Sequence, residues 1–162
     1  MNCTNCGAPL APVAGRDFFR CDHCETIHFA AAPEDSLDRV VTLEGLSGDD
    51  CPVCQEPLGA GALEGVCVGY CPSCRGILLS HETFGHVVGK RRREYDGPDI
   101  TPAPRDPVQL ERRIACPRCS RAMETHSYYG PGNSVIDTCA ACSLVFVDCG
   151  EIAAIEQAPG RR

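Results

Sequence analysis

The sequence predicts a small, metal-stabilised and mainly β protein made of three modules in tandem, with short helices after the second and third modules. Two observations lead to this fold class. Twelve of the 14 cysteines lie in six Cys-x-x-Cys pairs, and these pairs form three couples with internal gaps of 14, 16 and 19 residues. The runs between the pairs are short and alternate in polarity, as in VCVGYC at 66–71, which is typical of strands.

The spacing of the cysteine pairs predicts a four-thiolate zinc site in each module. Each Cys-x-x-Cys turn brings two sulfurs to one side of a tight loop, and two such turns complete a tetrahedron around one ion. Because four cysteines leave no position for substrate or for an activated water, these sites are expected to be structural rather than catalytic. The expected ligands are Cys3, Cys6, Cys21, Cys24, Cys51, Cys54, Cys71, Cys74, Cys116, Cys119, Cys139 and Cys142.

Zn²⁺, one ion per module, is the expected cofactor. Mononuclear iron is the less favoured alternative, because four sulfurs also suit it, and a redox-active dithiol is an alternative for any single pair. Modules of roughly 30 to 40 residues rarely bury enough apolar surface to fold without a metal, disulfides or a partner. We therefore expect thiolate-bound ions, rather than an apolar interior, to hold the modules together.

Cysteine usage and the N-terminal sequence favour a reducing compartment. A disulfide framework in a secreted protein is the rival use of so many cysteines. The segment MNCTNCGAPL has neither the basic start nor the apolar stretch of a secretory signal. No apolar run approaches the roughly 20 residues of a membrane span. We expect a cytoplasmic protein that does not contact a membrane.

Composition shifts divide the chain into modules and linkers. The expected ranges are a first module at 1–32, an acidic linker with a candidate strand at 33–50, a second module with a helix at 51–95, a Pro-rich linker at 96–107, a third module with a short helix at 108–158, and a tail at 159–162. Strands are expected around 18–19, 26–29, 66–70, 76–80, 134–139 and 144–148. The stretch GAGALEG at 59–65 is expected to be a Gly-rich turn.

Helix signals follow the second and third modules. Ser80 is a candidate N-cap for a helix at 81–95. Asp148 with Glu151 resembles a capping box, which predicts a short helix at 149–157. Gly7 and Gly76, just after the cysteine turns, are expected to supply positive φ angles.

Two cysteines lie outside the couples. Cys67 is expected to be a buried small hydrophobe, with the role of an alternative metal ligand left open. Cys149 lies where a helix begins, and a helix N-terminus can lower the pKa of a thiol. An oxidisable thiol at Cys149 is therefore one hypothesis, and a bystander role is the other.

A basic run, Lys90, Arg91, Arg92 and Arg93, is the feature that could contact nucleic acid. The alternative is a solvated helix end whose cations complement the helix dipole. The formal net charge of −7 argues against binding that depends on phosphate contacts. No Ser/His/Asp set, paired carboxylates or phosphate loop is evident, so neither an enzyme nor a small-molecule substrate is expected.

The second and third modules resemble the TFIIB-type zinc-ribbon family. The relevant segments are CPVC…CPSCRGILLS at 51–80 and CPRC…CAACSLVFVDCGEI at 116–152. The family pattern has two cysteine pairs around a strand, followed by a Trp-Leu-Asp-x-Gly-Glu stretch. The resemblance is close at 116–152, partial at 51–84, and that of a generic zinc ribbon at 3–29. It implies three tandem zinc ribbons and Zn²⁺ binding, without a specific activity.

Departures from the family pattern are concentrated in the second module. In the third module Phe146 replaces the Trp, while Asp148, Gly150 and Glu151 are kept. In the second module Leu78 stands at the Trp position, Ser80 at the Asp position, and Glu82-Thr83 at the Gly-Glu position. These changes bear on any role of that stretch and leave the metal ligands untouched.

The expected function is that of a structural zinc-binding protein that presents ribbon surfaces to another macromolecule. Protein is favoured as the partner, because exposed ribbon edges can pair with partner strands. A nucleic-acid-binding or transcription-associated ribbon is one alternative. A switch in which oxidation or zinc loss unfolds a module is another.

Overall fold

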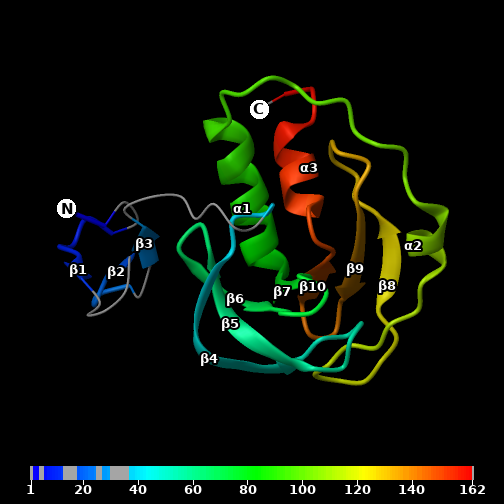
Figure 1. Ribbon diagram of the computed structural model, residues 1–162, viewed down its shortest axis with the longest axis horizontal. Helices are drawn as coiled ribbons and strands as arrows, with labels where there is room; N and C mark the ends of the chain where they lie inside the picture. Colours follow the sequence, from blue (N-terminus) through cyan, green and yellow to red (C-terminus); the bar gives the residue numbers. More distant parts are fainter. Residues whose placement is uncertain (1, 4–5, 13–17, 25–26, 30–36, 162) are drawn as a thin grey trace.

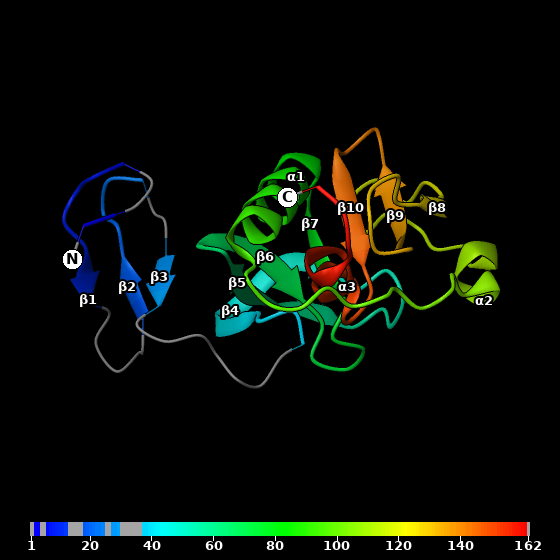
Figure 2. The ribbon, with the colours of Figure 1, turned by 90° about the horizontal axis from the view of Figure 1, so that it is seen from above.

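The computed structural model describes residues 2–3, 6–12, 18–24, 27–29 and 37–161, and over these residues the chain is mainly β with a small helical content (Figure 1). Its strands form a three-stranded sheet and a seven-stranded sheet. The three-stranded sheet lies at one end of the molecule and α2 (Pro107–Glu111) at the other (Figure 2). The predicted fold class, mainly β with three four-cysteine modules, is confirmed.

The small sheet comes from the first module and has the order β1-β2-β3. Its strands are β1 (Ala11–Pro12), β2 (Phe18–Arg20) and β3 (Ile27–Phe29), all antiparallel. The strands expected around 18–19 and 26–29 are therefore present.

The large sheet has the order β4-β5-β6-β7-β10-β9-β8 and combines the second and third modules. Its strands are β4 (Val41–Asp50), β5 (Pro57–Leu63), β6 (Val66–Tyr70), β7 (Ile77–Ser80), β8 (Glu124–Ser127), β9 (Val135–Cys139) and β10 (Leu144–Val147). The candidate strand in the acidic linker is β4, which pairs with β5. The Pro-rich linker thus connects two modules that share one sheet.

The hairpin of the second module has a shorter loop and a longer first strand than the sequence predicts. The stretch GAGALEG is not a turn, because β5 runs through Leu63 and the reversal occurs at Glu64 and Gly65, both with positive φ. A Cβ at Gly61 would lie 3.0 Å from Val40 Cγ1 and 3.2 Å from Tyr70 Cβ. The glycines in this strand therefore allow close packing rather than a turn.

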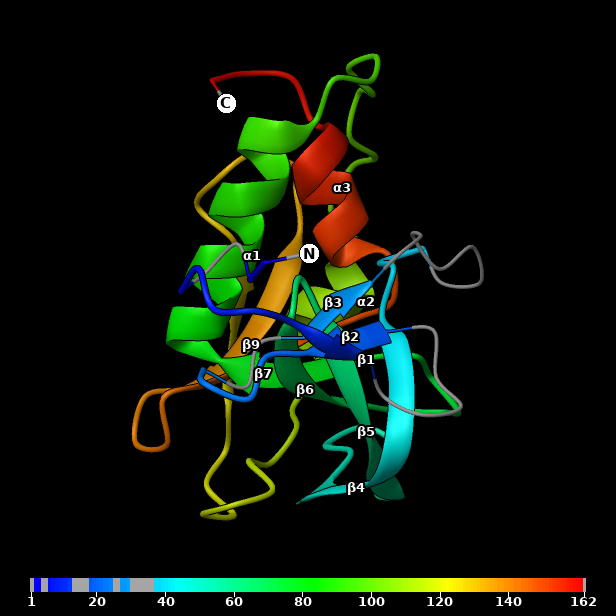
Figure 3. The same ribbon diagram turned by 90° about the vertical axis from the view of Figure 1, so that its left-hand side faces the viewer.

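Helices α1 (His81–Glu94) and α3 (Glu151–Gln157) lie side by side over the large sheet (Figures 1 and 3). Helix α1 begins where predicted, and the Ser80 side chain accepts a hydrogen bond from the Thr83 N–H at 3.0 Å. Within the described part of the chain, no helix has the length and apolar character needed to cross a membrane.

Two clusters of buried side chains hold the second and third modules together. One lies between the sheet and the two helices and includes Val87, Val145 and Ile152, each fully buried. The other surrounds the cysteines of both modules and includes Leu58 and Phe146. The expectation that ions rather than an apolar interior hold the modules together is therefore wrong for these two modules, because their shared sheet creates a common core.

Candidate metal centres

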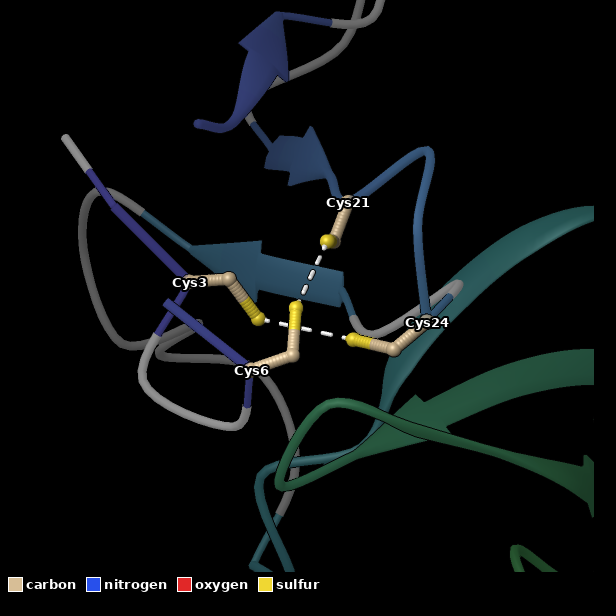
Figure 4. Close-up of side chains that lie close together, drawn as sticks. All are labelled: Cys3, Cys6, Cys21 and Cys24. Carbon is tan, nitrogen blue, oxygen red and sulfur yellow. Dashed lines mark hydrogen bonds between the residues drawn. The ribbon is translucent and has the colours of Figure 1, made fainter. Parts of the chain in front are cut away.

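The first cysteine quartet lies in the small sheet. Figure 4 shows the four side chains of Cys3, Cys6, Cys21 and Cys24 pointing toward one another. The sulfurs of Cys3 and Cys24 are 3.5 Å apart, and those of Cys6 and Cys21 are also 3.5 Å apart. The turn between Cys3 and Cys6 is closed by the Gly7 N–H, which donates to the Cys3 carbonyl at 2.8 Å.

The second quartet joins the turns that precede β5 and follow β6. The sulfurs of Cys51 and Cys74 are 3.7 Å apart. The backbone N–H groups of Cys54 and Cys74 donate to the sulfurs of Cys51 and Cys71, both at 3.4 Å. N–H donors aimed at sulfur stabilise the thiolate form that a metal requires.

The third quartet is built in the same way around β8 and β9. The sulfurs of Cys119 and Cys139 are 3.6 Å apart. The Ser120 N–H closes the first turn by donating to the Cys116 carbonyl at 2.8 Å. Next to this quartet, Arg118 pairs with Asp49, near the end of β4, at 2.8 Å.

All twelve predicted ligands are thus brought together in three groups, and in each group the sulfurs lie within 4.8 Å of one another. Tetrahedral Zn²⁺ with Zn–S near 2.3 Å requires sulfurs about 3.8 Å apart. The closest pairs, at 3.5 to 3.7 Å, are slightly tighter than this spacing. The donor set and its geometry therefore fit one tetrahedral thiolate-bound ion in each module.

The charge balance within a quartet also fits a divalent cation. In the third module, a backbone hydrogen bond from the Arg121 N–H lowers the pKa of Cys119 to about 7. Hydrogen bonding to the Cys119 sulfur, together with burial, raises the pKa of Cys142 to about 12. Four clustered thiols cannot all ionise unaided, because each thiolate raises the pKa of its neighbours. A bound dication would compensate this repulsion.

A residue with positive φ follows every described first-pair turn and the second-pair turns of modules two and three. These residues are Gly7, Gln55, Arg75, Ser120 and Ser143, with φ between 52° and 77°. The expectation for Gly7 is confirmed. The one for Gly76 is wrong, since Arg75 takes the left-handed position.

Gly76 has a different role, which depends on a long-range contact. A Cβ at this position would overlap the ring of Phe146, with Cε2 at 2.9 Å, Cε1 at 3.1 Å and Cζ closer still. The absent side chain lets Phe146 of the third module pack against the backbone beside the second quartet. Spacing along the sequence gives no signal for such a contact.

The basic run at the end of α1 is largely turned inward. Arg91 is buried, and its Nε donates to Glu64 at 2.7 Å, while Lys90 donates to the same carboxylate at 2.9 Å. Arg92 is also buried and donates to the carbonyl oxygens of Ile155 at 2.6 Å and Ala158 at 3.1 Å. Neither side chain forms the solvated helix end expected as the alternative to nucleic-acid contact, because α3 packs over them. Arg93 is exposed.

Asp38 caps helix α3, a role that sequence reasoning missed. Helix α3 begins at Glu151 with Gly150 as its N-cap, and no side chain in the predicted capping box accepts from it. Instead the buried carboxylate of Asp38 accepts from the backbone N–H groups of Gly150 and, at 3.0 Å, Ala153. The capping group thus comes from the linker, more than 100 residues away along the chain.

Asp148, predicted to cap α3, is used elsewhere. Its carboxylate accepts from Arg112 and from Gln109, both at 2.9 Å. Arg112 also binds the buried Asp137 and lies over the Phe146 ring, with Cζ 5.9 Å from the ring centre. Asp148 therefore holds the segment after the Pro-rich linker against the third ribbon.

Of the two cysteines outside the quartets, Cys67 differs from expectation. Cys67 is exposed rather than buried, because it lies on β6 next to the buried Val68 and points to the opposite face of the sheet. Burial raises the pKa of the Cys149 thiol, and the Asp38 carboxylate adds to this effect, so the lowered pKa on which the oxidisable-thiol hypothesis depends is not found. A raised pKa reduces the thiolate fraction that oxidation requires.

Comparison with known proteins gives one family match. Residues 50–88 match the model of a TFIIB-type zinc ribbon, described as a transcription factor zinc-finger. No curated protein and no solved structure matches the chain significantly. The match falls on the second module, where the resemblance read from the sequence is partial. The family match and the three cysteine quartets together support a structural zinc-binding protein, and the resemblance to the TFIIB-type zinc-ribbon family is confirmed over residues 50–88.

Proposed function

We propose that this chain is a non-catalytic cytoplasmic protein in which three Zn²⁺ ions, one per ribbon, hold surfaces in place for binding another protein. The metal part of the proposal is supported by four-cysteine groups, which leave no open coordination position for chemistry. Cytoplasmic location is supported by the need to keep these thiols reduced. Native mass spectrometry is expected to find three zinc ions and no iron. Cys-to-Ser changes at Cys54, Cys6 or Cys119 should each remove one ion.

The observation that carries the choice of partner is the inward placement of the basic run. Phosphate binding needs exposed cations, and the two central arginines have relative exposures of 2% and 6%. Their guanidinium groups are occupied by Glu64 and by α3 carbonyls. The chain also carries a net charge of −7. A protein partner is therefore favoured over nucleic acid.

A hollow beside the third quartet suits a partner side chain. Its volume is about 430 Å³, and its lining includes Phe84, Tyr128, Ile136 and Leu144. Tyr128 packs edge-on against Phe84 with ring centres 5.4 Å apart. Tyr129 stacks on His126 at 5.7 Å and is 92% exposed. Aromatic, partly polar walls of this kind are typical of protein-binding hot spots.

The test compares two kinds of partner directly. Labelled single- and double-stranded nucleic acids are titrated with the zinc-loaded chain at low and physiological salt, and no salt-dependent affinity is expected. In parallel, proteins retained by the chain from cell extract are compared with those retained by Tyr129→Ser. Selective loss of a partner supports the proposal. Salt-dependent nucleic-acid binding that Arg93→Ser weakens would contradict it.

A further inference from the structure

The three modules are the same ribbon, strand for strand and register for register. In each, the residue eight positions after the first cysteine pairs with the residue before the third cysteine: Ala11 with Arg20, Gly59 with Tyr70, and Glu124 with Thr138. The next hairpin is equally regular, pairing Arg20 with Ile27, Tyr70 with Ile77, and Thr138 with Val145. Strands β3, β7 and β10 are therefore equivalent.

Modules two and three are joined through these equivalent strands. Strand β7 pairs antiparallel with β10, and Leu78 lies opposite Phe146. These two residues are equivalent, because each lies four residues after the last cysteine of its own module. Ile77 lies opposite Val147, and Leu79 lies opposite Val145. The first of the three positions in one ribbon therefore pairs with the third position in the other, and the middle positions pair with each other. This reciprocal pairing is the rule of a two-fold symmetric interface. The second and third ribbons form a pseudo-dimer inside one chain.

The equivalent strand of the first module has no such partner among the described residues. Strand β3 pairs with β2 on one side, and the described chain places no strand on the other. An unpaired edge presents a row of N–H and C=O groups that can template pairing with another strand.

The other sheet edges in the described chain are each blocked. Strand β1 contains Pro12, which has no N–H to donate. Strand β4 has two shifts of register, and its Gly45 and Gly48 have positive φ angles. Strand β8 is covered by the segment after α2, whose Arg112 carbonyl accepts from the Thr125 hydroxyl at 3.0 Å. Strand β3 has neither proline nor a break in register.

We propose that β3 pairs antiparallel with β3 of a second copy of this chain, repeating between chains the contact that β7 and β10 make within one. His28 then lies opposite His28 of the other copy, and Ile27 lies opposite Phe29. Residues 1–32 carry two arginines against three acidic residues, so little net charge opposes the contact. This self-association goes beyond the proposed function, which concerns a different protein.

Three residues on each side form a small interface, so the association is weak and concentration-dependent. Sedimentation velocity of the zinc-loaded chain from about 10 µM to about 1 mM is expected to show a reversible monomer–dimer equilibrium. Hydrogen exchange of the unmodified chain should show the amides within 27–29 that point away from β2 becoming more protected as concentration rises. The amides of β1 should not change.

Paired charge changes test the register. Chains carrying Ile27→Lys with Phe29→Lys, or Ile27→Glu with Phe29→Glu, are each expected to be monomeric, since like charges lie opposite one another. Mixing the two should restore a dimer, because every lysine then faces a glutamate. Native mass spectrometry verifies that each variant keeps the zinc content of the parent. Ala11→Lys, on the opposite edge of the same sheet, is the matched control and should associate like the parent.

Several outcomes would overturn the proposal. One is a monomer over the whole concentration range without protection of 27–29. Another is association that survives both charge variants at unchanged zinc content, which would place the contact elsewhere. Failure of the mixture to dimerise would reject the register. None of these results bears on capture of a different protein through the aromatic hollow, so failure here and failure of the proposed function are distinguishable.

Discussion

Gly76 of the second ribbon packs against the Phe146 ring of the third, and replacement of Gly76 gives the sharpest test of that contact. A methyl group there would lie 2.9 Å from Phe146 Cε2 and 3.1 Å from Cε1. Phe146 is fully buried, and its ring also lies beneath the Arg112 guanidinium. The ring can therefore move only by disturbing the core, and such overpacking costs about 1–3 kcal/mol. Gly76→Ala is expected to lower the free energy of unfolding by that amount.

The same chain provides a matched control. Gly85 lies in α1, and a Cβ there would meet no atom within 4 Å. Gly85→Ala should raise the free energy of unfolding by about 0.5–1 kcal/mol, because alanine favours the helix. Both variants are compared by urea unfolding of the zinc-loaded chain, with zinc content checked beforehand. The packing argument is refuted when Gly76→Ala is as stable as the parent. It is also refuted when Gly76→Ala costs as much stability in a Phe146→Leu background as it does in the parent.

Three further outcomes follow from contacts in the structure. Asp38→Ala should cost about 1–3 kcal/mol, because two N–H groups at the start of α3 lose their acceptor, and exchange of the Ala153 amide should report this loss. Although burial raises the pKa of Glu64, hydrogen bonds from Lys90 and Arg91 outweigh burial and hold this pKa below its usual range. The ionised Glu64 therefore contributes stability above its unfolded-state pKa, and this stability is lost as pH falls through the lower folded-state pKa. The stability difference between Glu64→Gln and the parent should therefore shrink on acidification, and a constant difference would refute the ion-pair role. A strong zinc chelator at neutral pH should abolish exchange protection in 18–20 before it does so in 144–147; simultaneous loss would contradict separate dependence on metal.

The features that sequence predicted well are those set by local spacing. Two cysteine turns at fixed separation force a hairpin between them, so both the quartets and the ribbon strands could be placed from the sequence. Ser80 could be recognised because a cap acts within its own turn. The burial of Arg91 and Arg92 could not, since it depends on where the β5–β6 turn and α3 pack. The same holds for Asp38, whose partners lie at the far end of the chain.

The three ribbons share one design but differ in what stabilises them. Ribbons two and three bury each other's apolar side chains through β7 and β10, so bound ions add to a core that already exists. No residue of the first ribbon whose side chain is described belongs to either cluster. We expect thiolate–zinc binding, which supplies on the order of 10 kcal/mol, to stabilise this module of roughly 30 residues. Within the described part of the chain, no strand pairs with the outer edge of β3. Among these residues the first ribbon differs from the other two in one respect, since no second ribbon pairs with its last strand. We expect both the dependence on metal and the availability of β3 for pairing to follow from that difference.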